Sequence, residues 1–70
     1  MRNRDYIYAV HSLDRYGRPE CHYTTSQRGY ALNKATAIVK GDTARKLIGV
    51  SVTAVSNTSH VFTIFHWERS

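Results

Sequence analysis

The chain has 70 residues, one cysteine and a formal net charge of +5, and 41% of its residues are hydrophobic. This length supports one domain with a small core, and a single cysteine excludes an intramolecular disulfide bond. The hydrophobic content also separates the chain from disordered segments, which combine low hydrophobicity with high net charge.

The segment 6–25 predicts a β-hairpin. Two stretches rich in strand-forming residues flank Gly17, and glycine can adopt the positive φ that a tight turn requires. A two-residue turn at Tyr16-Gly17 would set the strand pairs, which include His11 with His22 and Val10 with Tyr23. The more apolar face of this hairpin would then hold Tyr8, Val10, Cys21 and Tyr23.

The next segment predicts a main helix followed by a short one. Thr25 or Ser26 is the expected N-cap, and Gly41 is the expected stop. Asp42 would cap a short helix over residues 43–48, and the alternative is a loop that leads into the next strand. The side chains at helical spacing on the main helix are Leu32, Ala35, Ile38 and Val39.

The remaining sequence predicts a second hairpin with strands over 50–56 and 60–67 and a turn at Asn57-Thr58. The core face, where Phe65 and Trp67 are expected to be mostly buried, would hold Val50, Val52, Ala54, Val61, Phe65 and Trp67. The opposite face would hold Ser51, Thr53, Val55, His60, Phe62, Ile64 and His66. Because one set of helices cannot cover both faces, we expect self-association through Val55, His60, Phe62 and Ile64, most simply as a homodimer.

These segments predict a single α+β domain over residues 1–70, with residues 1–5 as a flexible basic arm. The expected order is β-β-α-(short α)-β-β, with antiparallel hairpins packed on one main helix. No apolar run approaches the about 20 residues of a membrane span, and the first residues lack the apolar stretch of a secretory signal. The expected location is therefore the cytoplasm.

The sequence lacks the patterns that carry catalysis or metal binding. Cys21 and His22 are neighbours on an expected strand and so point to opposite faces, and no Cys-x-x-Cys or His-x-x-x-His pair is present. The acidic residues form no close pair suited to acid–base catalysis, and the glycines are too dispersed for a phosphate-binding loop. We therefore expect no enzymatic activity, no metal and no cofactor.

The charge favours a polyanionic partner, because ten Lys and Arg residues outnumber five Asp and Glu residues. Arginines and tyrosines alternate in the first half of the chain, and single-strand-binding proteins use such mixtures to stack bases and contact phosphates. The residues expected to bind nucleic acid or an acidic partner are Arg2, Arg4, Arg15, Tyr16, Arg18, Arg28, Lys34, Arg45 and Lys46.

The first hypothesis is therefore a small, basic, non-enzymatic nucleic-acid-binding protein. The alternative is a protein-interaction or inhibitor protein, such as an accessory protein of a mobile element. Such a protein would bind an acidic protein surface or add a strand to a partner's sheet.

Overall fold

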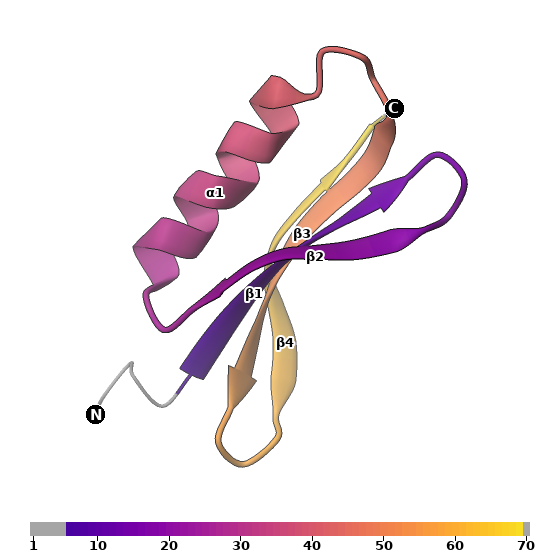
Figure 1. Ribbon diagram of the computed structural model, residues 1–70. Helices are drawn as coiled ribbons and strands as arrows, with labels where there is room; N and C mark the ends of the chain where they lie inside the picture. Colours follow the sequence, from indigo (N-terminus) through magenta and orange to yellow (C-terminus); the bar gives the residue numbers. More distant parts are fainter. Residues whose placement is uncertain (1–5, 70) are drawn as a thin grey trace.

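A computed structural model describes residues 6–69 and shows one helix packed on a four-stranded antiparallel sheet (Figure 1). The elements are β1 (Tyr6–Asp14), β2 (Pro19–Thr25), α1 (Arg28–Gly41), β3 (Leu47–Ser56) and β4 (Val61–Glu68). The sheet order is β2-β1-β3-β4, so the two hairpins join through their first strands. This arrangement confirms the predicted α+β domain. Within residues 6–69, no helix has the length and apolar character needed to cross a membrane.

The core lies between α1 and one face of the sheet. Val10 and Val52 pair across the central strands β1 and β3, and neither has exposed surface. Ala31 and Ala35 of α1 belong to the same cluster and are also fully buried, since their small side chains let the helix approach the sheet closely. Partly buried side chains pack around this cluster, including Leu32, Ile38, Val39, Phe65 and Trp67.

A β-bulge in β4 changes the predicted faces of that strand. The register with β3 shifts between Val52 and Thr53, which leaves Ile64 as an extra residue packed toward the core. Before the bulge the alternation is inverted, so Phe62 lies on the helix side and Val61 on the opposite face. The prediction that placed Val61 in the core, and Phe62 and Ile64 opposite it, was wrong because strict alternation does not allow for an extra residue.

A matching bulge occurs in β2 at His22. Val10 pairs with Tyr23 as predicted, but His11 pairs with Cys21 instead of His22. Cys21 therefore shares a face with His11, away from α1, and the prediction that grouped it with Tyr23 was wrong. The cause lies in the turn, which contains three residues rather than two and ends on a glycine with positive φ.

The two bulges give the sheet an approximate two-fold symmetry. Equivalent positions of the two hairpins are separated by the same number of residues along the chain, and these pairs are Val10 and Val52, His22 and Ile64, and Tyr23 and Phe65. Because a bulge increases the local right-handed twist, both outer strands rotate away from the central pair (Figure 1). Helix α1 packs on β1, β2 and β3 from one face, and within residues 6–69 no helix covers the other face.

The predicted short helix is absent, and residues 42–46 form a loop. The Asp42 carboxylate accepts hydrogen bonds from the backbone N–H groups of Lys46 and Leu47, each at 3.0 Å, and pairs with the Arg69 guanidinium at 2.6 Å. Arg45 adopts a left-handed backbone conformation with φ of 57°. The sequence alternative of a loop leading into the strand is therefore correct, and β3 begins at Leu47.

Candidate nucleic-acid interface

The turn between β1 and β2, called here the basic turn (residues 14–18), presents an exposed tyrosine between two arginines. The guanidinium carbons of Arg15 and Arg18 each lie 5.5 Å from the centre of the Tyr16 ring. Tyr16 itself is 70% exposed. Gly17 completes the turn with φ of 81°, a conformation that side chains with a Cβ rarely adopt. A flat aromatic ring and two cations are thus held together at the surface.

The carboxylate of Asp14 holds the basic turn in this shape. It accepts hydrogen bonds from the backbone N–H groups of Tyr16 and Arg18, both at 2.9 Å. The hydrogen bond from Arg18, and secondarily that from Tyr16 and the charges of Arg18 and Arg15, lower the pKa of Asp14 below its ordinary value of 3.8. Asp14 therefore stays ionised at neutral pH and fixes the backbone from which the arginines project.

The loop after α1 lies beside the basic turn. The backbone N–H of Arg15 donates to the carbonyl of Lys46 at 3.0 Å. A cleft of about 430 Å³ between these segments is lined by Asp14, Arg15, Tyr16, Glu20, Lys46 and Leu47. Arg45 is exposed next to Lys46, so the fold gathers four of the predicted cations at one end of the sheet. Glu20 is the acidic side chain that borders the same cleft away from the turn.

The other predicted cations lie elsewhere. The Lys34 ammonium lies 5.9 Å from the centre of the Tyr23 ring, beside a shallow hollow between α1 and β2. Arg28 is the first residue of α1 and borders a separate pocket. Arg2 and Arg4 lie outside the described residues. The predicted binding residues within 6–69 therefore fall into three places, each of which combines an aromatic side chain with a cation.

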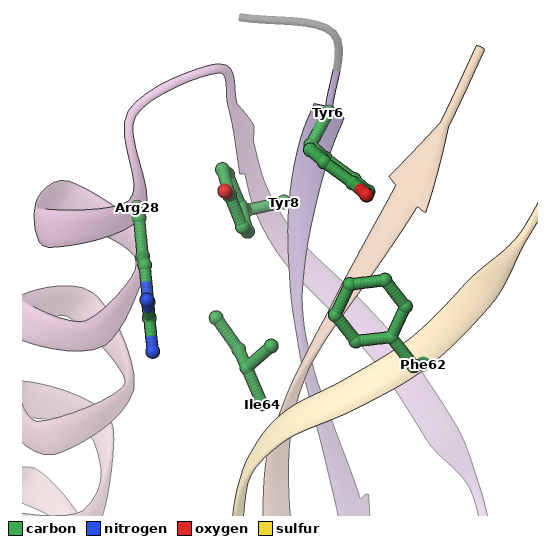
Figure 2. A pocket seen from close by; sticks show the side chains of 5 residues that line it. All are labelled: Tyr6, Tyr8, Arg28, Phe62 and Ile64. Atoms are coloured by element: carbon green, nitrogen blue, oxygen red, sulfur yellow. The ribbon is translucent and has the colours of Figure 1, made fainter. Parts of the chain in front are cut away.

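The pocket beside Arg28 is the part of the surface that sequence reasoning missed. It has a volume of about 240 Å³ and is lined by Tyr6, Tyr8, Arg28, Phe62 and Ile64, called here the aromatic pocket (Figure 2). The tyrosines come from β1, whereas Phe62 and Ile64 come from β4. The only sequence signal was the interleaving of tyrosines with arginines, because the contribution of β4 depends on the bulge.

The residues predicted to mediate self-association do not share one surface. Val55 lies on the face opposite α1, and His60 is exposed in the β3–β4 turn, where its N–H donates to the Ser56 hydroxyl at 3.1 Å. Phe62 and Ile64 lie on the helix side. The face without a helix, called here the open face, instead presents the apolar side chains Ile7, Leu13, Val55 and Val61.

Among residues 6–69, no group of three or more His, Cys, Asp and Glu side chains is arranged to hold a metal ion. Cys21 is exposed and unbridged. Comparison of the chain with protein-family models, curated proteins and solved structures gives no match. The functional argument therefore depends on the geometry of these surfaces.

Proposed function

We propose that the protein is a small, non-enzymatic, cytoplasmic nucleic-acid-binding protein whose basic turn contacts the phosphate backbone. The observation that carries this proposal is the exposed Tyr16 ring, with the guanidinium carbons of Arg15 and Arg18 each 5.5 Å from its centre. A guanidinium group over an aromatic face keeps its N–H donors, which lie in its own plane, available for phosphate oxygens. In the described part of the chain, neither arginine forms a salt bridge that would occupy these donors.

The surroundings of the basic turn support the same proposal. Arg45 and Lys46 extend the positive surface onto the neighbouring loop, and both are exposed. The acid in that loop, Asp42, is engaged by backbone N–H groups and by Arg69. Because affinity for nucleic acid depends mainly on phosphates neutralised by Lys and Arg, a rigid cluster of exposed cations favours this class of partner.

The test is the salt dependence of binding to a random-sequence oligonucleotide, measured by fluorescence anisotropy. The variant is R18Q, and the control is K40Q, which loses the same charge from α1. Since each neutralised phosphate contributes about 0.9 to the slope of log K against log salt for duplex DNA and about 0.7 for a single strand, R18Q should lower the magnitude of that slope by nearly one. Absence of binding near physiological salt, or equal effects of the two variants, would refute the proposal.

The open face favours a second candidate function, binding of protein. Ile7 is 48% exposed and Val61 is 63% exposed, and both lie next to Val55 across the sheet. Contiguous apolar side chains of this kind are typical of interaction surfaces, and a homodimer or an accessory-protein partner would bury them.

Sedimentation equilibrium at micromolar concentration tests this second candidate. If the open face forms a homodimer, the wild type should sediment as a dimer and V61K as a monomer, because lysine would place a charge in the interface. A wild-type monomer at every concentration would exclude the homodimer.

A further inference from the structure

The aromatic pocket is a depression in the sheet that has a simple steric origin. Ala54 of β3 pairs with Tyr8 on one side and with Phe62 on the other. The small Ala54 side chain lets the larger side chains on either side of it project above the sheet, and Ala54 itself is 1% exposed. The pocket is therefore lined by side chains of β1 and β4, the strands on either side of β3, and by Arg28 of α1.

Aromatic rings form most of the wall. The Tyr6 and Phe62 ring centres lie 5.6 Å apart with an angle of 79° between the planes, and the Tyr6 and Tyr8 centres lie 6.4 Å apart. Phe62 is 47% exposed, so a ligand can reach its ring. Figure 2 shows these side chains and Ile64 around one space, with the Arg28 side chain along its helix-facing side.

The polar features of the pocket suit an anion next to a flat ring. Arg28 supplies a guanidinium group, and it is also the first residue of α1, whose N-terminus carries a partial positive charge. The first turn of α1 contains no acidic residue, and its N-cap Gln27 makes no side-chain hydrogen bond to the helix. The expected N-cap, Thr25 or Ser26, was therefore wrong, and the Thr25 hydroxyl instead accepts a hydrogen bond from the Gln27 N–H at 3.1 Å.

The volume limits the ligand to one ring system. Sites for drug-sized molecules usually enclose about 300–1,000 Å³. The aromatic pocket, at about 240 Å³, is smaller than this range. A single planar group that stacks on an aromatic wall and carries a phosphate therefore fits the pocket better than an extended apolar ligand does.

We propose that the aromatic pocket binds one unpaired base of a single-stranded nucleic acid, with Arg28 contacting the adjacent phosphate. This inference rests on the proposed function and specifies its substrate, because bases in a duplex are stacked and paired and cannot enter the pocket. The pocket and the basic turn lie at opposite ends of β1, whose nine residues span roughly 30 Å. A single strand bound at both places would cross the molecule along its helix-bearing side.

The test compares two probes of equal charge, an oligothymidylate of about 16 nucleotides and an abasic strand of the same length. This length is the upper end of the site sizes of small single-strand-binding folds. Affinities are measured by fluorescence anisotropy for the wild type and for F62L, R28Q and Y30L. F62L retains apolar volume but removes the stacking surface. Y30L is the matched control, because Tyr30 is an exposed aromatic residue on α1 outside the pocket.

The wild type should bind oligothymidylate roughly 5- to 150-fold more tightly than the abasic strand, as expected for stacking of one base. F62L should abolish this preference, R28Q should reduce binding of both strands, and Y30L should keep the preference. Unchanged binding of the abasic strand by F62L would show that the variant is folded.

Two results would overturn the inference in different ways. If both strands bind equally tightly to the wild type, or if Y30L and F62L lose the preference equally, the base pocket is wrong while the phosphate-binding function stands. If neither strand binds, the proposed function fails and the base pocket fails with it.

Discussion

The assignment of α1 to one face of the sheet can be tested with the same substitution at two positions of β3. Val52 has no exposed surface and lies beneath α1, whereas Val55 is half-buried on the open face. Replacement of either valine by alanine removes two methyl groups from the same strand. Because both sites lie on the same strand, which is paired on both sides, the difference between V52A and V55A reports side-chain packing and burial.

The expected magnitudes follow from the packing. Loss of two buried methyl groups costs about 1.6 kcal/mol in transfer free energy. The neighbouring Ala31 and Ala35 are too small to fill the cavity, so V52A should lose about 2–3 kcal/mol in total. V55A should lose less than about 1 kcal/mol, because water and not a void replaces the missing groups.

Thermal unfolding followed by circular dichroism measures this difference. For a domain of this length, the loss at Val52 should lower Tm by about 8–24 °C. The total free energy of unfolding is roughly 4–10 kcal/mol for 70 residues, so the V52A variant should remain folded at room temperature. Equal shifts for V52A and V55A, or a larger shift for V55A, would show that α1 does not cover the face assigned to it.

Two further predictions concern the segments that shape the basic end of the sheet. The hydrogen bond from the backbone N–H of Leu47, assisted by Lys46 and Arg69, lowers the pKa of Asp42 below its ordinary value of 3.8. The ionised carboxylate therefore stabilises the fold above that pH, and this stabilisation is lost as the pH falls through the lowered pKa. D42N should therefore unfold more readily than wild type at pH 7, and denaturant titrations should show the two proteins converging below pH 3.8; a constant difference at every pH would contradict this. G17A should lose about 1–2 kcal/mol in thermal unfolding, since the added Cβ meets no atom within 4 Å and only the positive φ opposes it; an unchanged midpoint would mean that the turn can adopt another conformation.

Local sequence patterns predicted the elements of the fold but not the faces of its outer strands. Strand-forming stretches, the turn glycine Gly17 and the end of the helix at Gly41 were all identified, because each depends on neighbouring residues only. The bulges at His22 and Ile64 were not, since an extra residue leaves the composition of a strand unchanged. In the outer strands, the face assignments between each bulge and its turn, those of Cys21, Val61 and Phe62, were consequently inverted.

The same distinction applies to the loop after α1 and to the candidate interface. Asp42 resembles a helix cap in sequence, but its carboxylate is engaged by Arg69 from the far end of the chain. The proximity of Arg15 and Arg18 to Tyr16 follows from one turn and could be anticipated. The aromatic pocket requires the register of β4 against β3, which is a long-range property that no local pattern contains.

The symmetric arrangement of the hairpins has a consequence for how quickly the chain folds. Each hairpin is closed by a short turn, and hairpins form within about 1–10 μs. Pairing of β1 with β3, in contrast, must close a loop that contains both β2 and α1. The entropy of that closure is recovered only when α1 packs over the joined central strands. Docking of two preformed hairpins, rather than formation of either one, should therefore limit the folding rate.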